Sequence, residues 1–132
     1  MTYEEWEREI PAAVKQDVIW RVQAYRLALY LSACAKLDTQ DLAGNPLYEA
    51  HIPQLCRAAA SVAAAIAEGY PRRSAKDRAR YYEYALGSLA ETKVWYVDIG
   101  SALGAEVLQA RFAVIRSITR LLLTMKRHAR TH

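Results

Sequence analysis

Helix-breaking residues are scarce in this chain of 132 residues, which has only five glycines and four prolines. Long regular elements are therefore expected. The two cysteines, Cys34 and Cys56, lack metal-ligand spacing and have no companions, so we expect reduced thiols rather than a disulfide framework. A composition that is 53% hydrophobic and 24% charged excludes a disordered chain and is typical of one globular domain.

Long hydrophobic runs are also missing. The longest uncharged apolar run, residues 58–67, is far shorter than the ~20 residues that a membrane-spanning helix needs. The first residues, MTYEEWEREIP, are acidic and carry no basic region followed by an apolar one, so no secretory signal is expected. We therefore expect a soluble, cytoplasmic protein with no membrane partner.

What the chain does have is apolar residues at helical spacing. Thr2 and Glu5 form a capping-box pattern that opens a short helix, and Pro11 should end it. The spacing then predicts four long helices, over residues 14–37, 48–68, 74 to 99–103, and 105–127. The fold class expected is all-α, an antiparallel up-down-up-down four-helix bundle with a short extra N-terminal helix. The domain organisation expected is an N-terminal extension (1–13), the bundle (14–128) and a basic tail (129–132).

Small residues mark the expected contact between the two central helices. Gly69 is the expected residue just after the second long helix. Gly87 lies inside the third, where a glycine costs about 1 kcal/mol relative to alanine, so we predict close packing of Gly87 against residues 61–65. The packed face predicted for the third helix comprises Tyr81, Ala85, Ser88, Thr92 and Trp95.

These central helices resemble the 23S rRNA intervening-sequence proteins, also called the four-helix-bundle protein family. The matching stretches, within about residues 17–127, are Arg57-Ala58-Ala59, Ser61, Ile66-Ala67-Glu68-Gly69, Arg73-Ser74 and Ala85-Leu86-Gly87-Ser88-Leu89-Ala90-Glu91. The resemblance implies an antiparallel four-helix bundle, a homo-oligomer that assembles as a pentameric ring, and no firmly attached biochemical activity. It also implies structural roles for matched residues, namely Arg57, Ser61, Glu68, Gly69, Gly87, Ser88 and Glu91. For Glu68 and Glu91 we expect a cap or a buried ionic partnership with Arg57.

Positive charge is concentrated in two places. The net charge is +4; residues 71–80 hold five basic residues against one acid, and residues 111–132 hold six and no acid. Cations next to tyrosines suit single-stranded nucleic acid, in which phosphates take the charge and bases stack. The predicted nucleic-acid-binding residues are Arg72, Arg73, Lys76, Arg80, Arg116, Arg120, Arg127, Tyr70 and Tyr82. The alternative is a solvated loop beside core tyrosines, with the last cations favoured by the helix dipole.

Signatures of catalysis are missing. The chain has no glycine-rich phosphate loop, no cysteine with a neighbouring histidine and no Glu-x-x-His of a di-iron bundle. Arg120 and His128 are too far apart for the arginine–histidine spacing of small helical ribonucleases. We therefore expect a non-enzyme without cofactor or metal, a homo-oligomeric protein that binds RNA or serves as a scaffold. The alternative is a protein-interaction adaptor or accessory subunit that uses Trp6, Trp20, Trp95 and tyrosines; a metalloenzyme bundle is the weaker third possibility.

Overall fold

The computed structural model describes the backbone of residues 1–131 and the side chains of residues 1–129. Arg130 and His132 of the predicted basic tail therefore lie outside the described side chains. Every element in the described range is helical, which confirms the all-α prediction. Short elements come first, namely α1 (Tyr3–Arg8), α2 (Ala12–Lys15) and the 3-10 turn η1 (Val18–Arg21). The longer helices are α3 (Gln23–Thr39), α4 (His51–Gly69), α5 (Ala75–Leu103) and α6 (Ala105–Thr131), with a 3-10 turn η2 (Gln40–Leu42) after α3.

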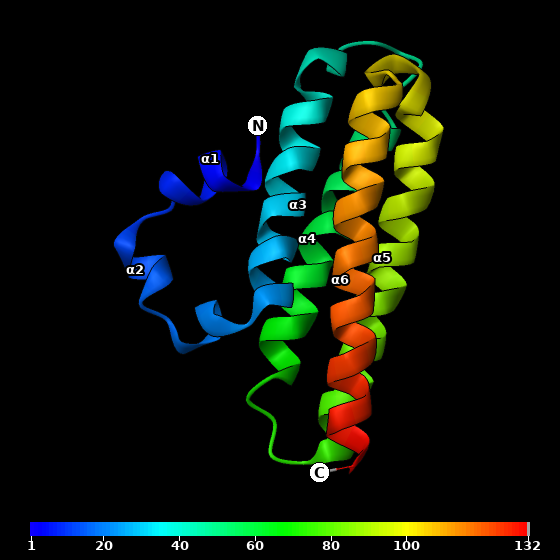
Figure 1. The fold of residues 1–132 in the computed structure, drawn as a ribbon. Coiled ribbons are helices and arrows are strands. Elements are labelled where there is room, and N and C mark those ends of the chain that lie inside the picture. The colour runs from blue at the N-terminus through cyan, green and yellow to red at the C-terminus, as the bar shows by residue number, and fades with distance from the viewer. Residues whose placement is uncertain (132) are drawn as a thin grey trace.

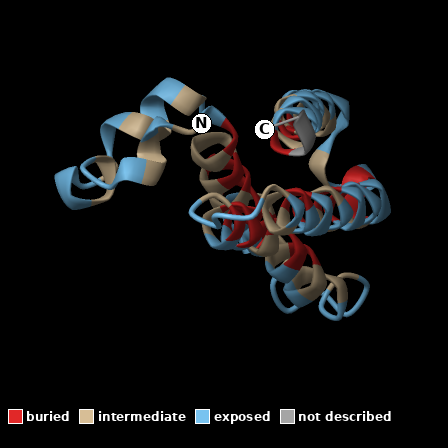
Figure 2. Cartoon of the chain, turned by 90° about the horizontal axis from the view of Figure 1, so that it is seen from below, coloured by how far each residue is buried: buried red, intermediate tan, exposed pale blue. Residues whose placement is uncertain are grey.

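The four long helices lie side by side, and the chain reverses direction between each of them and the next (Figure 1). Helix α3 packs on α4, α4 on α5, α5 on α6, and α6 returns against α3. Buried residues, red in Figure 2, gather where these helices face one another. Helices α1 and α2 lie to one side of the four, and α1 contacts α3 (Figure 1).

Small side chains on α4 build its contact with α5, the most extensive between two helices. Ala59, Val62 and Ile66 of α4 are fully buried, as is Ala85 of α5. Because alanine carries only a methyl group, the two backbones approach closely and larger residues of α5, such as Leu89, fill the remaining space. The sequence prediction that these two helices pack closely is confirmed.

The prediction of a helix over residues 14–37 was wrong at the start of the helix. The chain leaves the helix after Lys15, makes the η1 turn, and enters α3 only at Gln23. The side chain of Asp17 accepts a hydrogen bond from the backbone N–H of Ile19 at 3.2 Å and so caps η1. Val22 is extended, with φ −81° and ψ 109°. A local cap therefore overrides an apolar spacing that continues through the break.

The other predicted ends are closer to the structure. Thr2 and Glu5 form both hydrogen bonds of the capping box that opens α1. The side chain of Ser74 accepts from the N–H of Asp77 and caps α5. The helix ends at Leu103, and Gly104 follows it with a φ of 90°, a conformation that favours glycine.

The prediction about Gly87 was wrong. Gly87 is exposed, and a Cβ added there would meet nothing within 4 Å. The close approach occurs instead at Gly69, the last residue of α4, where an added Cβ would lie 2.5 Å from the Cβ of Tyr81. Gly69 thus permits the contact between the end of α4 and the start of α5, rather than ending the helix through a positive φ.

The inward face of α5 is also displaced from the predicted one. Ala85 and Thr92 are buried as expected, but the buried aromatic residues are Tyr82 and Tyr96 rather than Tyr81 and Trp95. Each buried tyrosine lies one position along from the predicted residue. Adjacent positions are about 100° apart on a helix, but Ala85 and Thr92 stay buried, so the face as a whole is turned by less than that. With Tyr82 and Tyr96 facing the core, Gly87 points toward solvent.

Candidate nucleic-acid interface

The first basic group, Arg72, Arg73, Lys76 and Arg80, lies at the turn between α4 and α5, and all four side chains are exposed. Arg72 donates from Nε to the backbone carbonyl of Glu68 and from Nη2 to the Tyr81 hydroxyl, both at 3.1 Å. Its guanidinium lies 4.8 Å from the centroid of the Tyr81 ring. Arg80 lies 5.3 Å from the same ring and pairs with Asp77 at 3.5 Å. These two cations are therefore engaged within the turn.

Arg78 forms hydrogen bonds with the backbone of the same turn. Its Nη1 donates to the backbone carbonyls of Arg72 at 2.8 Å and Arg73 at 2.9 Å. Arg73 and Lys76 pair with no carboxylate in the described part of the chain. Within this group they are the two side chains that remain open to an external anion.

The predicted stacking tyrosines are not both available. Tyr82 is only 3% exposed, so its ring cannot stack on a base, and that assignment was wrong. The same burial raises the pKa of Tyr82. Tyr70 is half-buried. Tyr81 and Tyr84, which the sequence also places next to these cations, have rings that meet edge to face with centroids 5.6 Å apart.

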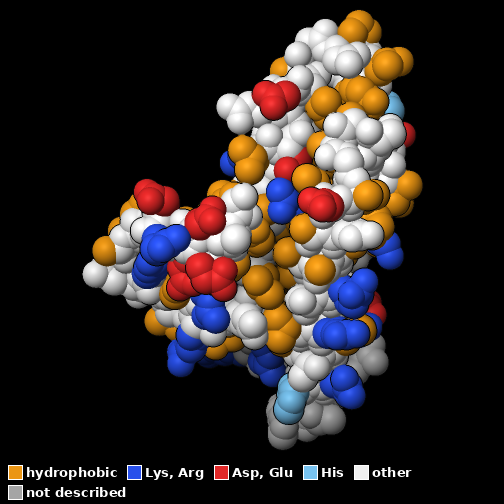
Figure 3. Space-filling model, turned by 45° about the horizontal axis from the view of Figure 1, so that its top comes forward, with side chains coloured by type: hydrophobic (Ala, Val, Ile, Leu, Met, Phe, Trp, Pro, Cys, Tyr) orange, Lys and Arg blue, Asp and Glu red, His pale blue; other side chains and the backbone are white. Residues whose placement is uncertain are grey.

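The second basic group lines a groove between α5 and α6. The groove has a volume of about 460 Å³. Lys93 of α5 and Arg116 and Arg120 of α6 supply its charge, and the rest of the lining is mostly apolar, from Leu86, Leu89, Ala90, Phe112, Ile115 and Thr119. Figure 3 shows Lys and Arg side chains gathered on the lower right of the molecule in that view.

The three cations of the groove differ from Arg80, whose charge is paired with that of Asp77. No carboxylate among the described side chains pairs with Lys93, Arg116 or Arg120. The Lys93 ammonium lies 5.4 Å from the Phe112 ring centroid, a cation–π contact that contributes about 0.5–1 kcal/mol at an exposed site. Sequence reasoning missed Lys93 because it stands outside both basic runs, and only the packing of α5 on α6 brings it to Arg116.

Arg127 is exposed near the carboxyl end of α6. Figure 1 shows this end of α6 beside the start of α5, so Arg127 lies at the same end of the molecule as the first basic group. The preceding residue, Lys126, forms an ion pair with Glu83 that ties α6 to α5 there. Arg120 and Arg116 lie about two and three helical turns before Arg127 on α6.

The buried ionic pair expected for Arg57 does not form. Arg57 is exposed and donates to the side chain of Gln54 at 3.2 Å. Glu68 and Glu91 are also exposed, and Glu91 accepts from the indole N–H of Trp95 at 3.4 Å. These carboxylates lie on outward faces of α4 and α5, so the expected buried partnership was wrong.

The two predicted structural serines act within their own helices. The Ser61 hydroxyl donates to the backbone carbonyl of Arg57 at 2.8 Å. The backbone carbonyl of Ser88 accepts from the hydroxyl of buried Thr92 at 2.7 Å. Both contacts are local and link one helical turn to the next.

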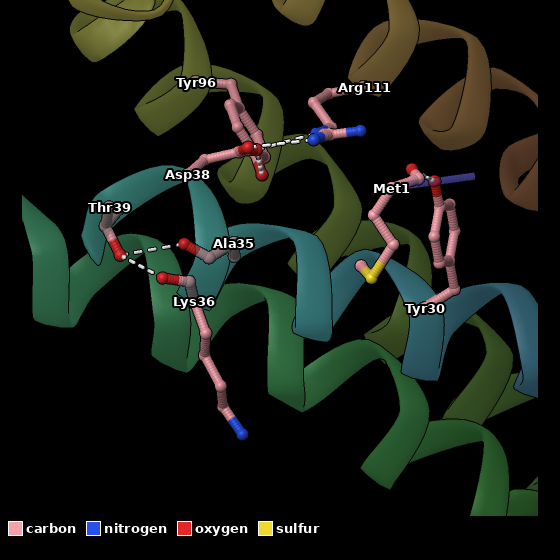
Figure 4. Close-up of polar contacts among 8 residues, drawn as sticks. All are labelled: Met1, Tyr30, Ala35, Lys36, Asp38, Thr39, Tyr96 and Arg111. Carbon is pink, nitrogen blue, oxygen red and sulfur yellow. Dashed lines mark hydrogen bonds and ion pairs between the residues drawn. The ribbon is translucent and has the colours of Figure 1, made fainter. Parts of the chain in front are cut away.

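A different buried pair joins three helices. Arg111 of α6 donates from Nε to Asp38 Oδ2 at 2.7 Å and from Nη2 to Asp38 Oδ1 at 2.9 Å, and both side chains are at most 8% exposed. The Tyr96 hydroxyl of α5 donates to the same carboxylate at 2.7 Å (Figure 4). This hydrogen bonding raises the pKa of Arg111, and burial raises that of Tyr96. Arg111 therefore stays charged and Tyr96 stays neutral.

Next to this pair, burial raises the pKa of the Cys34 thiol, and that of Tyr30 to about 12. The Tyr30 hydroxyl donates to the backbone carbonyl of Met1 at 2.7 Å and anchors the start of the chain to α3 (Figure 4). In the described residues, no three His, Cys, Asp or Glu side chains are grouped to hold a metal ion. None of the described helices is long and apolar enough to cross a membrane.

The all-α chain with four long packed helices belongs to a known family. The family model described as 23S rRNA-intervening sequence protein matches residues 26–105, so the chain is a member of that family. No curated protein matches the chain. The match runs from α3 to the first residue of α6, which is shorter than the expected 17–127, and the α6 arginines lie beyond it.

Proposed function

We propose that this chain is a non-catalytic, homo-oligomeric four-helix-bundle protein that binds RNA through the basic surface of α5 and α6. One observation carries the proposal: Lys93, Arg116 and Arg120 line one groove and have no carboxylate partner in the described chain. Unpaired cations at one hollow attract phosphates, and the release of counterions from a nucleic acid then favours binding. The family description, which refers to 23S rRNA, supports RNA as the polyanion.

The remaining predicted cations extend this surface at one end. Arg127, Arg73 and Lys76 are exposed there and would contact phosphates beyond the groove. Arg72 and Arg80, engaged with Tyr81 and Asp77, would contribute mainly by shaping the turn. The successive contacts of α3, α4, α5 and α6 support the antiparallel four-helix bundle as the scaffold.

Exposed apolar residues on α5 support self-association. Val94 and Val97 are 61% and 60% exposed and stand one turn apart, and Tyr84 is 54% exposed on the same helix. Exposed apolar patches on soluble proteins mark contact surfaces. A pentameric ring, as the family resemblance implies, would repeat the groove in each copy and raise the avidity for a long RNA.

The test is a titration of labelled single-stranded RNA at low and at physiological salt. We expect affinity to fall as salt rises. In the double variant Arg116→Gln with Arg120→Gln, the slope of log affinity against log salt should fall by about 1.4, since each phosphate contact on a single strand contributes about 0.7. The matched control is Arg21→Gln with Arg57→Gln, which removes the same charge from exposed positions away from the groove. If both variants reduce this slope equally, RNA binds at a site other than the groove.

The second candidate is a protein-interaction adaptor or accessory subunit. Two observations favour it. Val94 and Val97 are exposed on α5, and Trp6 stacks on Trp20 with ring centroids 6.1 Å apart. Aromatic residues are enriched at protein interfaces. A protein that binds no RNA at either salt concentration would support this candidate over the first.

A further inference from the structure

The α5–α6 groove combines two chemistries that a simple phosphate site does not need. Lys93, Arg116 and Arg120 supply positive charge, while Leu86 and Leu89 belong to an apolar lining. A duplex keeps its bases stacked inside and presents its phosphates outside, so duplex binding uses the cations and leaves the apolar lining unused. An unpaired nucleotide uses both.

Resting on the RNA binding proposed above, we propose that this groove takes one unpaired nucleotide of a single-stranded RNA. The base lies against Phe112 and Leu86, and the flanking phosphates lie on Arg116 and Arg120. The ligand class is therefore single-stranded rather than double-stranded RNA.

The dimensions of the groove fit this ligand. Its volume of about 460 Å³ falls within the roughly 300–1,000 Å³ typical of small-molecule sites. Phe112, Arg116 and Arg120 are spaced by four residues, so they lie on one side of α6 with a rise of about 6 Å between successive members. The aromatic ring and the two guanidinium groups thus follow one another along the groove, as a base and its phosphates do along a strand.

The Lys93 ammonium lies over the aromatic ring of Phe112. It lies 5.4 Å from the ring centroid, and the Lys93 side chain is exposed. Stacking of a base on an aromatic ring is stronger than an exposed cation–π contact. A bound base therefore displaces the ammonium from the ring, and the long lysine side chain turns to a phosphate at the opposite wall.

The experiment compares three labelled RNAs of equal length: a single strand, its blunt duplex, and the same single strand with abasic sites. The abasic strand keeps the phosphates and lacks the bases. We expect the intact single strand to bind about tenfold more tightly than the abasic strand, a difference typical of one stacked base. Equal affinity for the intact and abasic strands overturns the proposal.

The matched variants are Ala90→Leu, which fills the groove without changing charge, and Ala113→Leu, which adds the same atoms at an exposed position of α6 outside the lining. We expect Ala90→Leu to lower single-strand affinity about tenfold and leave duplex affinity unchanged, and Ala113→Leu to change neither. If Ala90→Leu binds the single strand as the unmodified protein does, the groove is not the base site. If no RNA binds at low salt, the proposed function itself fails, which is a different result from equal binding of all three RNAs.

Discussion

At the scale of single residues, Asp38 and Arg111 form a buried ion pair in which each charge depends on the other. The guanidinium takes both carboxylate oxygens, and Tyr96 donates to one of them, so the buried charges are paired and hydrogen-bonded. A buried pair of this kind contributes little net stability, because removing both charges from water costs nearly as much as their attraction returns. Removing one partner is different, since it leaves the other charge buried and alone.

We therefore expect Asp38→Asn to destabilise the fold by about 3–5 kcal/mol. The double variant Asp38→Leu with Arg111→Met should recover part of that loss, because it removes both charges and leaves only the Tyr96 hydroxyl without its acceptor. Urea unfolding followed by circular dichroism measures both free energies of unfolding. A double variant as unstable as Asp38→Asn would contradict this account of the pair.

Sequence reasoning had no means of finding this pair. Asp38 stands in a stretch that reads as a turn, and Arg111 is the first cation of a basic run. They are 73 residues apart, and only the return of α6 against α3 brings them together. The family motif instead directed attention to Arg57, Glu68 and Glu91, which the structure leaves exposed.

At the scale of helices, the approach of α4 to α5 depends on where each glycine falls. At Gly69 the added Cβ would meet the Cβ of Tyr81, an atom next to the backbone that has little freedom to move. At Gly87 the same added atom would project into open space. The alanine-rich sequence of α4 correctly predicted that α4 packs on α5. The rotation of α5 about its own axis decided that Gly69, and not Gly87, lies at the close contact.

These two glycines make a matched test. Gly69→Ala should lower the free energy of unfolding by about 1–3 kcal/mol, because the new methyl group forces α4 and α5 apart. Gly87→Ala should raise it by about 0.5–1 kcal/mol, because alanine favours the helix and nothing obstructs its Cβ. Chemical denaturation of both variants under the same conditions measures the difference. Stabilisation of Gly69→Ala would show that no close contact exists there.

At the scale of the whole molecule, charge and exposed apolar surface adjoin on α5, because Val94 and Val97 stand one helical turn after Ala90 and Lys93 of the groove. The groove with Lys93, Arg116 and Arg120 lies where α5 meets α6, and Val94 and Val97 are exposed on α5. RNA binding and self-association, as proposed here, therefore use neighbouring surfaces of α5. An assembled ring would then display several grooves at once.

We expect light scattering after gel filtration to give an integral multiple of the chain mass. Val94→Asp with Val97→Asp should dissociate the assembly to single chains, because carboxylates at an apolar contact lose hydration without gaining a partner. Leu123→Asp, at a residue 47% exposed on α6, serves as the control and should leave the mass unchanged. A monomeric unmodified protein would contradict the homo-oligomer.

By itself, the sequence determined the fold class, the number of long helices and most of their ends, because apolar periodicity, caps and glycines act within a few residues of one another. It also identified the family and the exposed cations Arg116 and Arg120. Only the tertiary structure decided the rotation of α5, the burial of Tyr82 and Tyr96, the pairing of Asp38 with Arg111, and the meeting of Lys93 with the α6 arginines. Each of these depends on contacts between helices far apart in the chain, and a local pattern carries no information about which faces meet.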